Sequence, residues 1–264
     1  MKTANITQDR IIEYLEQGKR FDGRKLDEFR ELIIEKNVAK KAEGSVRVRL
    51  GKTEVIVGIK MAVGTPYADS ANKGNLMVTA ELLPLSSPRI ELGPPKFRSI
   101  ELGRVIDRGI RESKVIDLEK LCIKEGEKVW TVFVDIYSIN DDGNLLDAAG
   151  IGALAALKIA KVPKYDEEEG KVLYGEPDRD LPLNNINPLP VTVHKIGNSL
   201  IVDPNCEEED ISESRITIGS SDGIISSMQK GEAVPITIEE MNKAVEMATN
   251  IWKELFKKFE KLLK

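Results

Sequence analysis

The residues best placed for chemistry lie in the segment DDGNLLDAAG, from Asp141 to Gly150. This segment follows a run of β-branched and aromatic residues that predicts a buried strand over Val129 to Ile139. It leads into an apolar stretch, Leu145 to Ala160, that predicts a helix inside the protein core. A helix that begins after a glycine-containing turn offers backbone N–H groups that attract anions. The corner between strand and helix is therefore a candidate phosphate site.

The side chains at this corner do not complete such a site. Phosphate sites ordinarily add an arginine or a hydroxyl group, but this chain has Leu145, Leu146 and Asp147 at the start of the helix. Because Asp147 is negatively charged, we expect it to repel an anion. From the residues alone, a corner that only packs is favoured over an anion site, which remains the alternative.

A second candidate group lies on the helix predicted from Phe97 to Ser113. Spacings of four and three residues place three positive side chains on one face of this helix, opposite an apolar stripe. The positive residues are Arg104, Arg108 and Arg111, and the stripe consists of Leu102, Ile106 and Ile110. Asp107 and Glu112 stand four residues from two of these arginines, so one interpretation is a solvated face of ion pairs.

Acidic residues form the third candidate group. The run from Glu207 to Asp210 is most simply the edge of an exposed loop. Together with Asp141, Asp142 and Asp147 it keeps a metal-dependent hydrolase open as a hypothesis, since carboxylates alone can hold Mg²⁺. No histidine supports such a ligand set, because the single histidine, His194, lies in a predicted strand and is expected to be a strand residue.

Composition limits the class of protein. The net charge of −5 over 264 residues argues against a protein that binds nucleic acid through a general excess of positive charge. It still allows a local basic patch. Cys122 and Cys206 are too few for a disulfide framework, which favours a reducing compartment. The N-terminus lacks the apolar region of a signal peptide, and no stretch is long enough to span a membrane. We therefore expect a cytoplasmic protein.

The order of elements predicts an α+β fold. A helix capped by Thr7 precedes a first group of strands, and a long helix from Ile238 closes the chain with Thr237 and Glu240 in a capping box. The expected strands are Glu31–Lys36, Ser45–Leu50, Thr53–Ala62, Asn75–Leu83, Pro190–Lys195, Ser199–Val202, Glu213–Ile218 and Gly223–Gln229. We expect one domain over residues 1–264. Its halves, approximately 1–163 and 187–264, would be joined by a charged loop region that includes Tyr165–Lys171.

Four segments in this order resemble the RNase PH family: RFDGRKLDEFR, EGSVRVRLGKTEVIVGIK, ELGRVIDRGIRES and DDGNLLDAAGIGALAALKIA. The similarity covers nearly the whole chain and is greatest to the non-catalytic RNase PH-like subunit of the archaeal exosome. It implies an RNase PH-like fold of two related βαβ-type halves, with mixed sheets packed against helices. Catalytic members degrade RNA from the 3′ end with inorganic phosphate. The first segment, Arg20–Arg30, read without the family, is a solvated charged connection.

Two departures from the family pattern indicate a non-catalytic member. Catalytic relatives read roughly DGGTRT at the central corner, where Thr and Arg hold phosphate, and those places fall here on Leu145 and Leu146. Relatives also carry two aspartates six residues apart, and Glu209 and Arg215 occupy those places here. The resemblance therefore implies no catalytic residue in this chain. A phosphate-dependent 3′-to-5′ exoribonuclease that uses unusual residues remains the alternative.

The same resemblance implies partners. The chain would alternate with a catalytic RNase PH-type subunit, as three heterodimers in a six-membered ring capped by RNA-binding proteins, and would shape the partner's active site. It would contact single-stranded RNA, and the related helix of catalytic members makes Arg104, Arg108 and Arg111 the candidate RNA-binding residues. No cofactor and no metal is expected.

Overall fold

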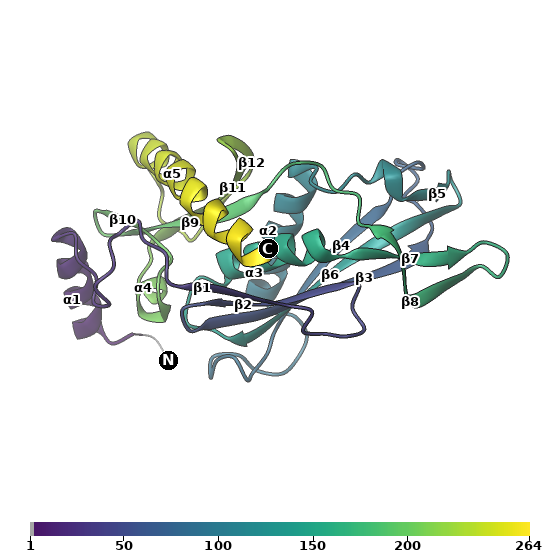
Figure 1. Ribbon diagram of the computed structural model, residues 1–264. Coiled ribbons are helices and arrows are strands. Elements are labelled where there is room, and N and C mark those ends of the chain that lie inside the picture. The colour runs from purple at the N-terminus through teal and green to yellow at the C-terminus, as the bar shows by residue number, and fades with distance from the viewer. Residues whose placement is uncertain (1–2) are drawn as a thin grey trace.

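The structure, a computed structural model, describes residues 3–264 (Figure 1). Two helices, α2 (Phe97–Ser113) and α3 (Leu145–Ile159), lie between two sheets, and both helices contact both sheets. The helix α1 (Asn5–Glu16) projects at the left of Figure 1, and the hairpin of β7 and β8 projects at the right. The α+β class and the long C-terminal helix, α5 (Ile238–Leu263), are confirmed.

The first sheet is mixed and has the strand order β1-β2-β3-β6-β4, with β5 paired to β6. Only β4 runs parallel to its neighbour β6, and α2 lies in the crossover between them. The strands are β1 (Leu32–Lys36), β2 (Gly44–Leu50), β3 (Thr53–Gly64), β4 (Asn75–Leu82), β5 (Cys122–Lys124) and β6 (Lys128–Asn140), and a short 3₁₀ helix, Glu119–Leu121, precedes β5. In β2 the predicted alternation is confirmed, because Val46 and Val48 are fully buried while Arg47 pairs with Glu35 and Glu54 on the other face.

Helix α3 lies in the core, as its sequence predicts. Eleven of its residues are apolar or glycine and buried, so it packs against β2 and β3 on one side and β9 (Leu189–Ile196) on the other. The apolar stripe predicted for α2 is also buried and packs toward β4 and α3. These two helices bring their N-terminal ends to the region where the candidate residues gather.

The second sheet is antiparallel and has the order β10-β9-β11-β12. Its other strands are β10 (Ser199–Val202), β11 (Ser214–Ser221) and β12 (Ile224–Gly231). Successive side chains of β9 point to opposite faces, so Thr192 bonds to Asp147 of α3 whereas Lys195 pairs with Glu240 of α5. The sheet is thus covered by the helix pair on one face and by α5 on the other.

Three local predictions need correction. The first helix begins at Asn5 after Ala4 and has no side-chain cap, so Thr7 is not its cap. The charged segment Tyr165–Lys171 is the turn of a hairpin of β7 (Lys161–Asp166) and β8 (Lys171–Asp180) and not only a loop. The acidic run is a helical turn, α4 (Cys206–Asp210), with a capping box from Asn205. Within residues 3–264 no helix combines the length and the apolar character that crossing a membrane needs.

Candidate functional site

The corner between β6 and α3 is a tight turn that ends in two left-handed residues. Gly143 has φ of 85° and Asn144 has φ of 59°. A Cβ atom on Gly143 would lie 2.6 Å from the carbonyl oxygen of Pro204, so this position accepts only glycine. The turn therefore lies directly against the segment that leads into α4.

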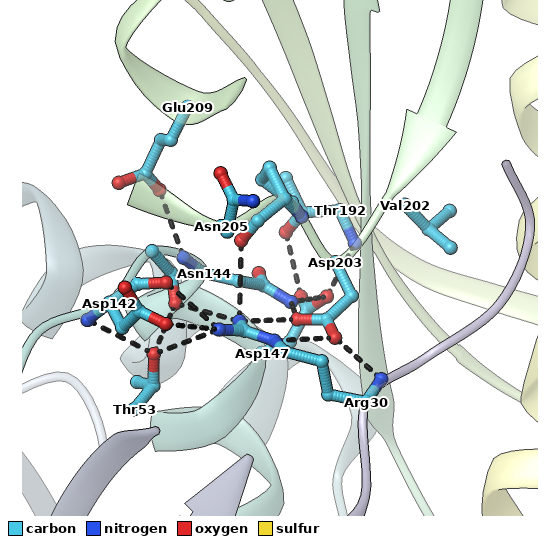
Figure 2. Close-up of polar contacts among 12 residues, drawn as sticks. Arg30, Thr53, Asp142, Asn144, Asp147, Thr192, Val202, Asp203, Asn205 and Glu209 are labelled. Carbon is cyan, nitrogen blue, oxygen red and sulfur yellow. Dashed lines mark hydrogen bonds and ion pairs between the residues drawn. The ribbon is translucent and has the colours of Figure 1, made fainter. Parts of the chain in front are cut away.

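The backbone N–H of Asn144 is already bound by an anionic group of the chain itself. It donates to Oε1 of Glu209 at 3.1 Å (Figure 2). The side-chain amide of Asn144 points away from Glu209 and donates to the buried carboxylates of Asp147 at 3.0 Å and Asp203 at 2.9 Å. An N–H group that a bound anion would use at this corner is thus bound by a carboxylate from α4.

A cleft of about 480 Å³ opens in front of this corner. It is lined by residues from α2, α3, α4, β9 and β11, and it contains all four residues that the resemblance assigns to the family's catalytic and phosphate-binding places. These residues are Leu145, Leu146, Glu209 and Arg215. The fold therefore brings these four positions to one cleft, and neither Leu145 nor Leu146 offers a hydrogen-bond donor to a phosphate.

Every arginine that lines the cleft within residues 3–264 is paired with a carboxylate of the chain. Arg89 pairs with Asp210 at 2.7 Å, and Arg98 pairs with Asp141 at 2.8 Å and with Glu209 at 3.1 Å. Arg215 pairs with Glu101 at 2.7 Å, and its Nε lies 3.7 Å from Glu232. The carboxylates outnumber the guanidinium groups, so the cleft has no surplus positive charge for an incoming anion.

The ionisation of these groups reflects their mutual contact. Burial acts to lower the pKa of Arg98, but the carboxylates of Glu209 and Asp141 outweigh burial and raise this pKa. Burial raises the pKa of Glu209, while Arg98 opposes this by stabilising the carboxylate. Neither Arg98 nor Arg89 was identified from the sequence, because nothing in their own segments indicates the acidic partners from α4.

Asp147 does not face the cleft, which corrects the expected repulsion of an anion by this residue. Its side chain is fully buried between α3 and β9 and accepts hydrogen bonds from Thr192 N (3.1 Å), Thr192 Oγ1 (2.7 Å) and Asn144 Nδ2. Burial raises the pKa of Asp147 to about 7. The carboxylate that excludes anions from the corner is therefore that of Glu209.

A buried ionic network holds the corner in place (Figure 2). Asp203, which is fully buried, accepts from the backbone N–H of Arg30 at 2.7 Å and from its Nε at 2.9 Å and Nη2 at 2.7 Å. The same guanidinium donates to the carbonyl oxygens of Asp142 at 2.8 Å and Gly143 at 3.0 Å. Arg24 adds a contact to Asp203 at 3.0 Å. The side chain of Arg30 thus connects the segment before β1 to the corner and to Asp203, the residue that follows β10.

This network corrects two sequence-based interpretations. The segment Arg20–Arg30 is solvated only in part, since Arg20 is buried and forms a bidentate pair with Glu208. The acidic run is not a simple loop edge, since Glu208 is buried in that pair and Glu209 closes the corner. The partners lie 188 positions apart in the chain, so neither segment alone could identify the other.

The three predicted RNA-binding arginines lie outside the cleft. Arg104 and Arg108 are exposed along a separate groove of about 380 Å³ between α2 and β4, and neither forms an ion pair within residues 3–264. Arg111 pairs with Asp107 at 2.7 Å and donates to the carbonyl oxygen of Leu76 at 3.0 Å. The hydrogen bond to Asp107 raises the pKa of Arg111. The described contacts include the expected pair of Arg111 but not the expected pair of Arg108 with Glu112.

The candidate metal ligands are dispersed. The described part of the chain contains no group of three or more His, Cys, Asp or Glu side chains that could hold a metal ion. Asp141 is bound to Arg98, and Asp142 lies 3.5 Å from Arg30. A metal-dependent hydrolase therefore has no ligand set among these residues. His194 is a buried strand residue of β9, as predicted.

The fold is that of the RNase PH class. The sequence matches the 3′ exoribonuclease family, with its domain 1 over residues 28–163 and its domain 2 over residues 187–251. The chain belongs to this family, which confirms the resemblance seen in the sequence.

Individual relatives cover almost the full chain. The chain is 50% identical over 248 residues to exosome complex component Rrp42 of Thermococcus onnurineus, covering 93% of this chain and 91% of the relative. It is 46% identical over 258 residues to the protein of the same name from Methanothermobacter thermautotrophicus, covering 97% and 95%. A solved Archaeoglobus fulgidus exosome with RNA bound to the active site contains a chain with TM-score 0.90 and 44% identity, covering 97% of this chain and 98% of that one. A chain of an archaeal exosome core gives TM-score 0.86 and 41% identity, with 97% of each chain covered.

Proposed function

We propose that this chain is a non-catalytic subunit of an archaeal exosome ring and acts in 3′-to-5′ phosphorolytic RNA degradation through a catalytic partner. The similarity to proteins named Rrp42 and to chains of solved archaeal exosomes supports membership of that assembly. One observation carries the non-catalytic assignment: the carboxylate of Glu209 binds the backbone N–H of Asn144 at the corner where catalytic relatives hold phosphate.

The energetics of phosphate binding support this assignment. A phosphate at the corner would need charged donors, each contributing on the order of 1.5–3 kcal/mol. Leu145 and Leu146 provide none, and Arg98 is held by two carboxylates. A phosphate would have to compete with these two carboxylates for the guanidinium of Arg98, and the side chain of Asp141 is itself buried. The rival hypothesis is an active exoribonuclease with unusual residues. It would need a donor that replaces the phosphate-binding Thr and Arg of catalytic relatives, and Leu145 and Leu146 are not donors.

The proposed partners follow from the relatives. The chain would alternate with a catalytic RNase PH-type subunit in three heterodimers, lie beneath RNA-binding cap proteins and contact single-stranded RNA in the cytoplasm. Its role would be to shape the active site of the catalytic subunit and to guide RNA. Arg104 and Arg108 are the best placed of the predicted RNA-binding residues, because they are exposed along the groove of α2 and β4.

The non-catalytic assignment is tested by incubating the purified chain with RNA in phosphate buffer, with and without Mg²⁺. We expect no release of nucleoside diphosphates and no shortening of the RNA. The catalytic partner assayed in parallel gives the positive control. Phosphate-dependent shortening by this chain, free of partner, would overturn the assignment in favour of the active enzyme.

Assembly is tested separately, by sedimentation of the chain mixed with a catalytic RNase PH-type subunit. A ring-sized particle is expected, with each heterodimer burying more than the roughly 1,600 Å² of a standard interface. Components that stay separate at micromolar concentration would contradict the ring.

A further inference from the structure

Two polar atoms at the cleft have no hydrogen-bond partner among residues 3–264. They are Nε2 of His194 and Nη1 of Arg215, and both atoms are buried. His194 is only 1% exposed, yet both residues line the cleft. They are direct cross-strand neighbours on β9 and β11 and share one face of the sheet. Buried polar groups are ordinarily satisfied, so these two adjacent atoms have the capacity to bind one further hydrogen-bonding group.

The hydrogen bonds of His194 define which atom donates. The hydroxyl of Ser212 donates to the carbonyl oxygen of Ser214 at 3.1 Å, so it accepts from Nδ1–H of His194 at 3.0 Å. Nε2 therefore carries a lone pair. Burial, with a further contribution from Arg215, lowers the pKa of His194 to about 3, and the ring is neutral at physiological pH. His194 offers an acceptor and Arg215 offers a donor.

A hydroxyl group matches this pair, because it donates to Nε2 and accepts from Nη1. An ammonium group has no lone pair for Arg215, and a phosphate dianion has no hydrogen for His194. The walls of the cleft add apolar surface, and the ring of Phe97 is 79% exposed beside it. The apolar lining residues are Leu82, Phe97, Leu102, Leu145 and Leu146. Such a wall accepts the flat face of an aromatic ring.

We propose that the cleft binds an uncharged molecule that joins a hydroxyl group to a flat apolar ring system, of which a nucleoside is the simplest biological example. His194 and Arg215 bind the hydroxyl, and the leucines and Phe97 contact the ring. The carboxylates of Glu209, Asp210 and Glu232 exclude the phosphorylated form. This inference goes beyond the proposed function and depends neither on ring assembly nor on RNA contact.

The probe is adenosine, titrated calorimetrically into the purified full-length chain. A ligand of this size in a pocket of ordinary quality gives a Kd on the order of 0.1 mM. Adenosine 5′-monophosphate is expected to bind at least about tenfold more weakly, because of the surplus of carboxylates. No saturation by about 5 mM adenosine, or equal binding of the monophosphate, would overturn the proposal and leave a cleft filled by water only.

Two substitutions at one position form a matched pair. His194→Asn keeps a donor near Ser212 and removes the acceptor at the place of Nε2, whereas His194→Gln reaches that place with a polar atom. We expect the first to weaken adenosine binding about tenfold and the second to retain most of it. Equal affinity of wild type and His194→Asn would contradict the role of this acceptor.

Loss of fold is controlled independently. Thermal melting shows whether either variant unfolds, and Leu146→Trp fills the cleft from α3 while His194 and Arg215 keep their own side chains. This variant is expected to abolish adenosine binding, and unchanged binding would place adenosine elsewhere. Arg104→Ala, in the separate groove, should leave the affinity unchanged.

Discussion

Two arginine-bearing surfaces flank helix α2, and they differ in how their charges are balanced. In the cleft at its N-terminal end, Arg89, Arg98 and Arg215 are each paired with carboxylates from α2, α4 or the corner. In the groove along β4, Arg104 and Arg108 are exposed and form no ion pair within residues 3–264. Arginines balanced within the chain stabilise the fold, whereas exposed and unbalanced arginines remain available to an external anion.

The two surfaces also differ in the free energy needed to make their arginines available to an external anion. Among the cleft arginines, Arg215 and its partner Glu101 are largely buried, so releasing Arg215 to a ligand would leave a charge without its partner inside the protein and cost several kcal/mol. Arg89 and Arg98 are more exposed, so their ion pairs hold them less strongly. An exposed arginine is already hydrated and loses little when a phosphate replaces water. The same residue type therefore has opposite roles on the two sides of one helix, and each role can be tested by substitution.

The largest effect is expected in the buried network behind the corner. Asp203→Asn preserves the size of the side chain, and asparagine tolerates the φ of 46° at this position. The substitution removes the negative charge that balances Arg24 and Arg30. We expect a loss of about 3–5 kcal/mol in the free energy of unfolding, measured with guanidinium chloride. The control is Asp180→Asn in the exposed pair with Lys161, which should cost a few tenths of a kcal/mol. Similar losses in both variants would show that burial of the network is unimportant.

The second effect concerns the corner between β6 and α3, where Glu209 of the same chain binds the backbone N–H of Asn144. Glu209→Ala removes the carboxylate from the N–H of Asn144 and from Arg98. Phosphate affinity should rise by roughly ten- to a hundredfold, since one charge-assisted hydrogen bond contributes on the order of 1.5–3 kcal/mol. Calorimetric titration of phosphate measures this gain. Glu207→Ala, an exposed neighbour on α4, should gain nothing, and an equal gain there would refute the specific role of Glu209.

The sequence predicted the elements well, because their signals are local. The alternation in β2 and the apolar character of α3 follow from periods of two and about 3.6 residues. The family motifs also brought Leu146, Glu209 and Arg215 to one place. These inferences needed no knowledge of which segments meet in space.

The pairing of distant segments could not be predicted. Arg20 and Glu208 stand in two charged runs that separately resemble solvated loops, and only the fold brings them into a buried pair. The directions in which the side chains at the corner point could not be predicted from the sequence either. Asp147 points into the core, where it accepts hydrogen bonds from Thr192 of β9, and Glu209 of α4 points to the N–H of Asn144.

The third prediction uses the buried carboxyl of Asp147, whose pKa of about 7 in the folded chain exceeds the value of about 3.9 in the unfolded chain. The folded state therefore favours the proton. Asp147's contribution to stability is greatest below pH ~4 and falls as the pH rises toward 7, by up to about 1.4 kcal/mol per pH unit. Unfolding free energies measured from pH 4.5 to 8 check this slope.

Asp147→Asn isolates that contribution. Its amide nitrogen can donate to Oγ1 of Thr192, which then donates to Oγ1 of Thr217 at 3.0 Å, so the hydrogen bonds of the protonated acid are kept. The variant should lose the part of the slope that Asp147 causes, and its advantage over the wild type should grow with rising pH. Parallel pH profiles for the two proteins would contradict a raised pKa.

The smallest effect on the fold, and the sharpest test of the open surface, comes from Arg104→Ala combined with Arg108→Ala. Because both side chains are exposed without ion pairs, stability should change by a few tenths of a kcal/mol at most. If they hold RNA phosphates, the assembled ring should bind RNA more weakly regardless of base sequence. The log–log dependence of affinity on salt should flatten by roughly 0.7 for each phosphate that is no longer neutralised.

Arg111→Ala is the matched control for this last prediction, since Arg111 lies on the same helix but is paired with Asp107 and bound to the carbonyl oxygen of Leu76. Its removal should leave the salt dependence of RNA binding close to that of the wild type. The net charge of −5 helps the comparison, because little diffuse positive charge can conceal the absence of one arginine. Unchanged slopes in both variants would assign the groove of α2 to the structure of the subunit and place the RNA path elsewhere. A flattened slope in Arg111→Ala alone would show that pairing within the chain does not exclude contact with RNA.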